Sequence, residues 1–247
     1  MLLPSAIIGL CIGSFINALV WRVAHAKTLG GRSMCVHCKK QLRNIDLIPV
    51  VSFFILKGKC RFCQKKISWQ YPIVEIITAV AFVFVTTQDI GPGMIHFQWI
   101  ILTLLITLFV VDFQYGILPD VLTLPAIATV VVLRLVMEPP LSVVGVDMIL
   151  GGLTGFSFFA LQWIISRGKW IGDGDIRFGV LMGVLLGFPG VLLALLLSYS
   201  IGSFFAMGLL ATHKRQWESR IALGPFLVIG TLITYYGGER ILSVLGL

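Results

Sequence analysis

Charged residues are scarce in this sequence. Of its 247 residues, 12% are charged and 57% are hydrophobic, whereas a soluble domain has about 25% charged and roughly 45–50% apolar residues. This imbalance excludes an ordinary soluble protein and predicts a chain that crosses a lipid membrane several times. The net charge of +8 might suggest nucleic acid, but eleven of the nineteen basic residues lie between Arg22 and Lys66. That clustering is typical of membrane topology, and we expect no nucleic-acid partner.

Several other signals are also absent. No basic segment precedes the first apolar stretch, residues 2–21, so we expect this stretch to be retained as a helix rather than removed as a signal peptide. No internal repeat, low-complexity tract or glycine-rich loop of the dinucleotide-binding type is evident. The fold must therefore be inferred from the spacing of apolar runs and from a few polar motifs.

Apolar runs divide the chain into about eight segments that can cross a bilayer. We predict an all-α polytopic membrane protein with both termini outside and spans at 2–21, 72–87, within 90–111, 121–136, 148–166, two within 178–212, and 221–238. The last pair requires a turn at residues 187–190. Seventeen of the nineteen basic residues then fall on the cytoplasmic side, as the positive-inside rule requires. Arg134 and Arg240 are left towards the outer side.

Four of the five cysteines form two C-x-x-C pairs, Cys35 with Cys38 and Cys60 with Cys63, with 21 residues between the pairs. Each pair can supply two thiolates to one tetrahedral zinc ion. Cytosolic thiols stay reduced, so we predict structural zinc, with a redox site or free thiols as the alternative. A site closed by four thiolates has no open position, and it should stabilise rather than catalyse.

The cysteines suggest a division into three parts. Residues 1–21 form the first transmembrane helix, residues 22–71 a small cytoplasmic zinc-binding domain, and residues 72–247 the remaining transmembrane domain. An apolar run at residues 49–56 lies inside the polar segment but is too short to span a bilayer. We expect it to be either the small core of the cytoplasmic domain or a segment at the membrane interface.

Two carboxylates stand within three residues in Gly172-Asp173-Gly174-Asp175, between two apolar segments. A carboxylate at the edge of the hydrocarbon layer is costly and by default indicates a functional site. Asp112 ends the third span and Asp175 begins the sixth, so the topology places both at one depth. Two such carboxylates share a proton. One can then act as a base for water and the other as an acid for a leaving amine, as in aspartic proteases.

Other roles for the acidic residues remain open at this point. Helix capping is the structural alternative, because an Asp before a helix satisfies free N–H groups; Asp120 and Asp173 fit that role. Asp147 is expected to begin the fifth helix, and Glu138 to be solvated outside. A proton-coupled transporter would use the same acids, but it predicts acids and broken helices near the bilayer midplane. Here the acids lie at cytoplasmic ends of spans.

Four stretches occur together in a familiar order. They are Gly13–Asn17 followed by Arg22; the two C-x-x-C pairs with Ile48-Pro49 and Tyr71–Glu75; Asp112 with Leu118-Pro119-Asp120 and Leu124-Pro125; and Gly172–Arg177, where Lys is the more usual last residue. With them the sequence resembles the type IV prepilin peptidases, intramembrane aspartic proteases of the Gly-x-Gly-Asp type. The resemblance covers nearly the whole chain.

The resemblance implies a catalytic pair, Asp112 and Asp175. Gly172, Gly174, Asp173 and Asp120 become the supporting motif. It implies prepilin or pseudopilin substrates with a short basic leader, which is removed after a glycine. It also implies an inner-membrane protein in contact with membrane lipid, with the active site and cysteine block on the cytoplasmic side.

Family members with the cysteine block typically also methylate the new N-terminal amine with S-adenosylmethionine. The resemblance therefore implies a methyltransferase associated with residues 22–71. Asn17, Arg22 and Glu75 lie between that block and the membrane and are candidates for binding the methyl donor. Helix packing, snorkelling and an ion pair are the structural alternatives for these three residues.

Overall fold

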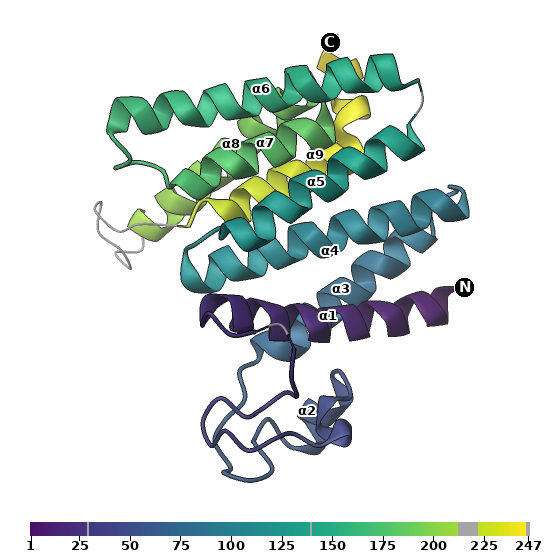
Figure 1. Ribbon diagram of the computed structural model, residues 1–247, viewed down its shortest axis with the longest axis vertical. Helices are drawn as coiled ribbons and strands as arrows, with labels where there is room; N and C mark the ends of the chain where they lie inside the picture. Colours follow the sequence, from purple (N-terminus) through teal and green to yellow (C-terminus); the bar gives the residue numbers. More distant parts are fainter. Residues whose placement is uncertain (29, 139, 212–221, 246–247) are drawn as a thin grey trace. The chain divides into compact units, whose positions relative to one another are not determined.

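The computed structural model of the protein describes residues 1–28, 30–138, 140–211 and 222–245 (Figure 1). Among these residues there are helices, loops and two isolated β-bridges, but no strand. The predicted all-α class is confirmed. Five helices are long and apolar enough to cross a membrane, namely those that begin at Leu2, Pro92, Asp120, Leu141 and Gly190. The protein is therefore polytopic, while the count of eight spans stays a prediction.

Each predicted span corresponds to one described helix. The long helices are α1 (Leu2–Ala24), α3 (Gln70–Thr86), α4 (Pro92–Tyr115), α5 (Asp120–Met137), α6 (Leu141–Ser166), α7 (Asp173–Leu186), α8 (Gly190–Ala211) and α9 (Gly224–Leu245). Two short helices, η1 (Asn44–Leu47) and α2 (Val51–Ile55), lie between α1 and α3. The predicted turn between the sixth and seventh spans is confirmed, because α7 ends at Leu186 and α8 begins at Gly190.

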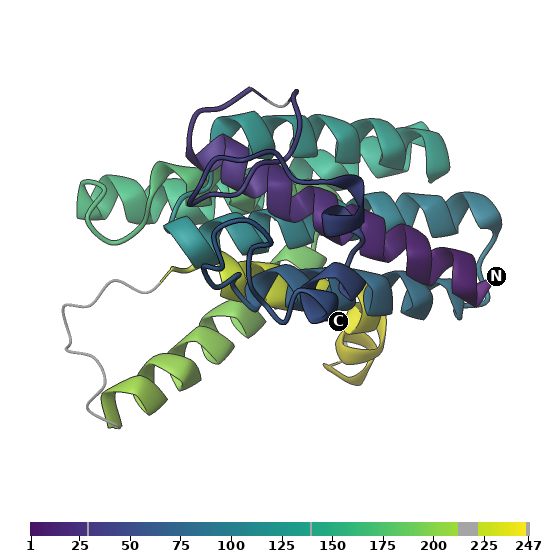
Figure 2. The ribbon, with the colours of Figure 1, turned by 90° about the horizontal axis from the view of Figure 1, so that it is seen from below.

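The chain divides into two compact units, Met1–Val110 and Val111–Leu247. In the first unit α1 and α3 pack side by side (Figures 1 and 2). Their backbones approach closely because α1 places glycines at the contact. A Cβ atom on Gly9 would lie 2.5 Å from the Ala79 Cα, and one on Gly13 would lie 2.6 Å from the Glu75 Cα. Small residues at such contacts are typical of membrane helices.

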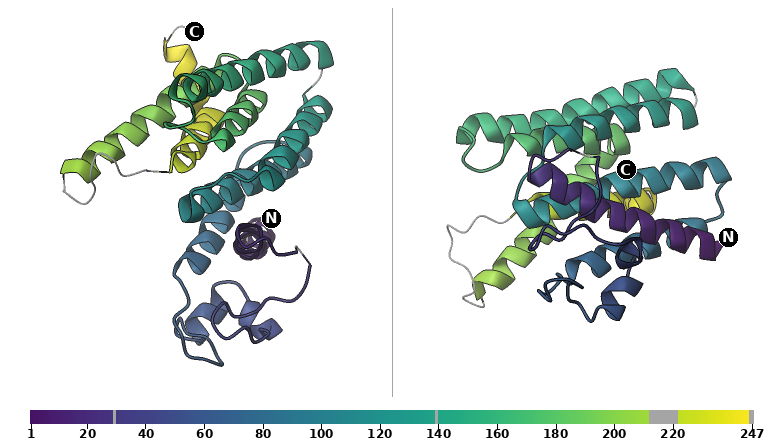
Figure 3. Two further views of the ribbon diagram at one scale, coloured as in Figure 1. Left: turned by 60° about the vertical axis from the view of Figure 1, so that its left-hand side comes forward. Right: turned by 60° about the horizontal axis from the view of Figure 1, so that its bottom comes forward.

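In the second unit α6 and α7 run alongside each other (Figure 3). The two helices also meet through glycines, since Gly151 faces Gly183 and Gly155 faces Gly179 with no room for a Cβ atom. α7 contacts α5, α8 and α9 as well, and several of its side chains, including Phe178 and Met182, are fully buried. α7 is therefore the central helix of this unit, with the predicted Gly-Asp motif at its beginning.

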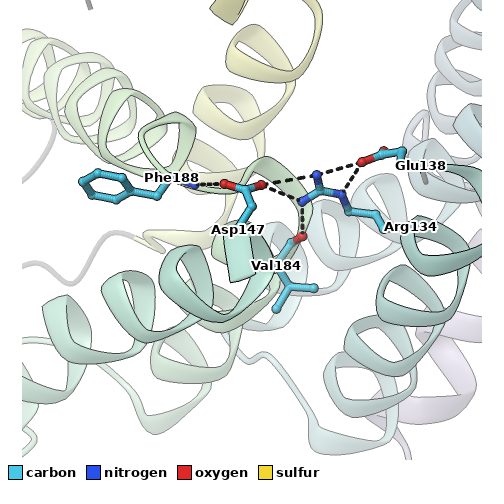
Figure 4. Close-up of polar contacts among 5 residues, drawn as sticks. All are labelled: Arg134, Glu138, Asp147, Val184 and Phe188. Atoms are coloured by element: carbon cyan, nitrogen blue, oxygen red, sulfur yellow. Dashed lines mark hydrogen bonds and ion pairs between the residues drawn. The ribbon is translucent and has the colours of Figure 1, made fainter. Parts of the chain in front are cut away.

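The buried cation Arg134 corrects the expectations for Glu138 and Asp147. Arg134 of α5 forms an ion pair with Glu138 at 2.7 Å and another with Asp147 of α6 at 3.3 Å. Its Nη1 atom donates a hydrogen bond to the Val184 carbonyl oxygen at 2.9 Å, and Asp147 accepts one from the Phe188 N–H at 2.8 Å (Figure 4). The interpretation of Glu138 as merely solvated is therefore wrong.

The start of α6 was also placed too late in the chain. The helix begins at Leu141, seven residues before the predicted span, and Asp147 lies in its second turn instead of at its start. A charge next to an apolar run favours a helix boundary, yet this carboxylate is accommodated inside the helix because Arg134 and the Phe188 N–H both bind it. The contacts of these side chains hold α5, α6 and the α7–α8 turn together.

Candidate active site and metal centre

The two predicted catalytic carboxylates lie in the second unit, each near one end of its helix. Asp112 is in the last turn of α4 and is buried. Asp175 is the third residue of α7. The two side chains are close enough for their charges to interact. The structure thus brings together two residues that are 63 positions apart in the sequence.

A glycine N–H holds one oxygen of each carboxylate. The Gly224 N–H, at the first residue of α9, donates to Asp112 Oδ2 at 2.9 Å. The Gly172 N–H, immediately before α7, donates to Asp175 Oδ2 at 2.9 Å. In both pairs the other carboxylate oxygen, Oδ1, has no protein hydrogen bond among the described residues. Each Oδ1 is therefore available to hold a proton or a water molecule.

The capping roles differ from those expected. Asp175, not Asp173, satisfies a free N–H at the start of α7, in the manner of a capping box. Neither Asp173 nor Asp120 caps its helix with its side chain; both instead contact Arg177. The Nη1 atom of Arg177 lies 2.8 Å from Asp120 Oδ1 and 3.2 Å from Asp173 Oδ2. These two acids therefore fix the loop before α5 to the first turn of α7.

Gly174 completes this junction. A Cβ atom at this position would lie 2.8 Å from the Leu118 Cβ and 2.9 Å from the Leu118 oxygen. Only glycine allows the start of α7 to pack against the Leu118–Asp120 loop. Gly172 is different, because a Cβ atom there would make an ordinary contact of 3.6 Å with Asp175 Oδ2. The contribution of Gly172 is its N–H group rather than its lack of a side chain.

Sequence reasoning missed Gly224. The last span was predicted to begin at residue 221, so the Gly224-Pro225 pair was absorbed into an apolar run. A Gly-Pro pair is a turn signal, and it was the available indication of a helix start. Nothing in a sequence marks a backbone N–H as the partner of a distant carboxylate.

The four cysteines of the two C-x-x-C pairs form a compact cluster in the first unit. Their sulfur atoms all lie within 4.8 Å of one another, and every one is a free thiol. The Sγ atoms of Cys35 and Cys63 are 3.9 Å apart. Tetrahedral zinc with Zn–S bonds near 2.3 Å separates its sulfur ligands by about 3.8 Å. The cluster therefore has the ligand set and spacing of a four-thiolate metal site.

The pKa values of the clustered thiols are shifted in opposite directions. Burial raises the pKa of Cys35, but the N–H groups of Cys38 and His37 lower it further, to about 7. At Cys63 the Lys65 N–H lowers the pKa, yet burial and the other three thiols raise it to about 11. One thiolate thus forms readily and opposes ionisation of the others. A bound dication removes that opposition.

The two cysteine pairs form an internal repeat that was not predicted. Residues 34–42 and 59–67 align as M-C-V-H-C-K-K-Q-L and K-C-R-F-C-Q-K-K-I. Both turns have the same two backbone hydrogen bonds. In the first turn the Cys35 N–H donates to the Lys40 oxygen and the Lys39 N–H donates to the Cys35 oxygen. In the second turn the Cys60 N–H donates to the Lys65 oxygen and the Gln64 N–H donates to the Cys60 oxygen. The repeat was missed because it is only nine residues long.

The three candidate methyl-donor residues are bonded to backbone groups of the first unit. Asn17 donates to the Tyr71 carbonyl oxygen at 3.1 Å, and Glu75 accepts from the Val50 N–H at 2.7 Å. Both side chains are buried between α1 and α3. Arg22 lies apart from them and donates to the Gly31 carbonyl oxygen at 2.7 Å. These contacts join the polar segment to the membrane helices.

Comparisons with known proteins agree with this arrangement. Residues 7–88 match the bacterial Peptidase A24 N-terminal domain, and residues 99–207 match the type IV leader peptidase family. The chain is 31% identical to a type 4 prepilin-like proteins leader peptide-processing enzyme of Escherichia coli O78:H11, over 92% of this chain and 91% of that one. No solved structure matches the chain.

A second similar protein is the prepilin leader peptidase/N-methyltransferase of Bacillus subtilis, which is 28% identical over 96% of this chain and 94% of its own. A third, of the same description, is from Aeromonas hydrophila, and is 31% identical over 85% of this chain and 73% of its own. The similarity therefore extends over both units and over nearly the whole length of two of these proteins.

Proposed function

Because the chain belongs to the type IV leader peptidase family, we propose that it is a membrane aspartic endopeptidase that removes the leader from prepilins or pseudopilins. The observation that carries this proposal is the pairing of Asp112 with Asp175 in one unit, each with one oxygen held by a glycine N–H. Paired carboxylates that share a proton are the groups that metal-free peptide hydrolysis needs.

The geometry suggests that one carboxylate acts as a general base and the other as a general acid. The ionised member accepts a proton from a water molecule as the water attacks the scissile carbonyl carbon. The protonated member donates its proton to the nitrogen of the leaving amine. The fixed Oδ2 atoms orient both groups, and the two Oδ1 atoms remain for the water and the shared proton. Burial near Asp112 keeps bulk water from competing with these contacts.

The proposed position of Asp112 and Asp175 at the membrane surface is consistent with a prepilin substrate. A prepilin has a short basic leader followed by an apolar helix, which can lie in the bilayer while the leader stays in the cytosol. The bond after the glycine would then reach the membrane surface, where we place Asp112 and Asp175. Asp120 and Asp173 are already paired with Arg177. These two acids therefore act in the supporting motif rather than as free counter-charges for the leader.

We propose N-methylation of the new terminus with S-adenosylmethionine as a second activity. The complete four-cysteine cluster and the N-methyltransferase in the names of similar proteins support it. Residues 22–71 would be a zinc domain on the cytoplasmic side, held by Cys35, Cys38, Cys60 and Cys63. Asn17, Arg22 and Glu75 would support the methyl-donor site by fixing that domain, since each already binds the backbone.

The peptidase is tested with purified protein, a prepilin and S-adenosylmethionine, and the product is weighed by mass spectrometry. Loss of the leader and gain of a methyl group are then separate signals. Asp112→Asn and Asp175→Asn should each abolish leader removal, because neither amide can share the proton. Asp89→Asn is the matched control, since Asp89 is an exposed loop residue outside the candidate site. Full cleavage by either active-site variant would exclude the pair.

A further inference from the structure

The short helix α2 leaves most of its apolar side chains uncovered in the first unit. Phe53 is only 7% exposed, whereas Val51 is 50%, Phe54 58% and Ile55 62% exposed. Trp69, just before α3, is 61% exposed, and its ring centroid lies 4.8 Å from that of Phe53 and 6.2 Å from that of Phe54. We call Val51, Phe54, Ile55 and Trp69 the α2 surface. A soluble core would have covered these side chains.

The depth of this surface is fixed by one hydrogen bond. The Val50 N–H, immediately before α2, donates to Glu75 Oε2 at 2.7 Å. Glu75 lies five residues inside α3, which is about 7 Å along the axis at a rise of 1.5 Å per residue. Glu75 also packs against Gly13 of α1. Gly13 lies nine residues before Arg22 on this helix, which is about 13 Å along the helix axis. α2 therefore starts at the level of the apolar spans and not beyond their ends.

The backbone at Val50 shows that this position is imposed. Val50 has φ of 60° and ψ of −52°, a conformation that is unfavourable for a β-branched residue. Such strain persists only where surrounding contacts determine it. Here the Glu75 carboxylate binds the Val50 N–H, and α2 follows the strained residue with its apolar side chains exposed.

We propose that α2 inserts into the cytoplasmic leaflet, with the acyl chains of phospholipids covering the α2 surface. Helices that lie in the interface bury their apolar side chains about 5–10 Å into the boundary between headgroups and acyl chains, and the position of Glu75, about 7 Å inside the start of α3, falls within this range. Trp69 then occupies the headgroup level that tryptophan prefers. The inference is independent of the catalytic proposal and decides between the two expectations for residues 49–56 in favour of the interface.

Charge complementarity supports lipid as the occupant. The segment from Arg22 to Lys66 carries eleven basic residues and one acid, Asp46, and that acid is paired with Arg61 at 2.7 Å. Lys57 and Lys59 follow α2 directly. Basic residues next to a membrane are attracted to the anionic lipids of the cytoplasmic leaflet. An apolar surface followed by two lysines that form no ion pair with any described residue therefore fits a bilayer better than another protein.

The test places a photoreactive side chain on the α2 surface of the full-length protein in phospholipid vesicles. Phe54→p-benzoylphenylalanine should form adducts with lipid, detected as a mass increase of one phospholipid. Arg43→p-benzoylphenylalanine is the control, because Arg43 is exposed and lies beside the Phe62 ring within the polar segment. The adduct yield should be several-fold higher at 54 than at 43. Equal yields, or an adduct with another polypeptide, would overturn the proposal.

A second measurement needs no reactive group. Tryptophan fluorescence is compared between the wild type and Trp69→Phe in vesicles of lipids brominated close to the headgroup and in vesicles of unbrominated lipids. The quenching lost in the variant reports Trp69 alone. We expect Trp69 to account for a clear share of the quenching. Identical quenching in both proteins would place Trp69 in water and contradict the insertion of α2.

Discussion

A single backbone N–H orients Asp112, and the residue that supplies it has no room for a side chain. A Cβ atom on Gly224 would lie 2.5 Å from Asp112 Oδ2 and 2.8 Å from its Cγ. Any other residue must therefore displace the carboxylate. Gly172 supplies the equivalent bond to Asp175 without this steric limit. The two carboxylates thus depend on their glycines in different ways.

We predict that Gly224→Ala lowers kcat for leader removal by about 100-fold, because a displacement near 1 Å in an active site has about that effect. KM should change little, since Gly224 contacts the proposed catalytic carboxylate of Asp112 and not the substrate. Gly145→Ala is the matched control, because a Cβ atom at that helical glycine meets nothing within 4 Å. Equal kcat in the two variants, at equal thermal stability, would show that the Gly224 bond does not orient Asp112.

At the scale of single residues, the sequence indicates which side chains belong to the candidate site, but it does not indicate which backbone groups bind them. Asp112 and Asp175 stand out because a carboxylate at the edge of an apolar run is rare. The hydrogen bond from Gly224 has no such signature, since every residue except proline has an N–H. The partners of Asp120 and Asp173 were also mistaken, because a nearby arginine attracts a carboxylate more strongly than a free backbone N–H does.

Arg134 connects three helices of the second unit through its side chain. Its side chain reaches from α5 to Asp147 on α6 and to the Val184 carbonyl oxygen on α7. Asp147 in turn accepts from the Phe188 N–H, and its carboxylate fills the space beside Gly187. A loss of the cation would leave the partly buried Asp147 carboxylate and the Val184 carbonyl oxygen without this partner.

Arg134→Met should therefore lower the free energy of unfolding by about 3 kcal/mol, the lower end of the range for breaking a buried ion pair. The partners are about one-third exposed, which keeps the effect at that end. Thermal unfolding in detergent measures it, with Arg240→Met as control, because Arg240 is exposed on α9. A double variant, Arg134→Met with Asp147→Asn, should recover part of the loss. Equal melting temperatures for the wild type and Arg134→Met would contradict this account.

Helix ends were harder to predict than helix number. Each apolar run became a helix, because a chain in lipid must satisfy its backbone groups internally. The observed helix ends differ from the predicted ones where a charged side chain is paired. α6 begins before Asp147, and α7 begins at Asp173 rather than at Phe178. Sequence patterns cannot anticipate such pairs, since Arg134 and Asp147 belong to different helices.

At the scale of the whole molecule, the polar segment between α1 and α3 depends on the cysteine cluster. It contains two short helices and no strand among its described residues. Phe53 and Cys60 are its only buried apolar side chains among those described. Such a small core cannot compensate for the conformational entropy of the chain, so we expect a bound metal to keep the segment folded.

Removal of the metal by a strong chelator should therefore increase hydrogen exchange across residues 30–67 while α5 to α9 stay protected. Freshly purified, reduced protein should contain one zinc ion per chain. Cys60→Ser should lose it, whereas Cys11→Ser should keep it, because Cys11 lies on α1 outside the cluster. Purified protein without zinc, or a chelator effect spread evenly over all helices, would refute the structural role.

The same segment should also respond to acid through Asp46. A hydrogen bond from Arg61 holds the pKa of Asp46 below its usual value. A lowered pKa in the folded state adds stability above the ordinary pKa, and this stability is lost as the pH falls through the lowered value. We expect Asp46→Asn to exchange faster than the wild type at neutral pH, and the difference to vanish in acid. Loss of zinc in acid affects both proteins alike. A difference in hydrogen exchange between Asp46→Asn and the wild type that persists in acid would therefore contradict the role of the Asp46 carboxylate.

The contacts of Arg134 have a consequence for how the protein is made. A ribosome completes α5 before Asp147 and Val184 have been synthesised, so the guanidinium reaches the translocon with only Glu138, four residues later, to neutralise it. Its remaining partners arrive with α6 and α7. We therefore expect those three helices to leave the translocon as one group. Biogenesis of the catalytic unit is thus set by the order in which opposite charges emerge during translation.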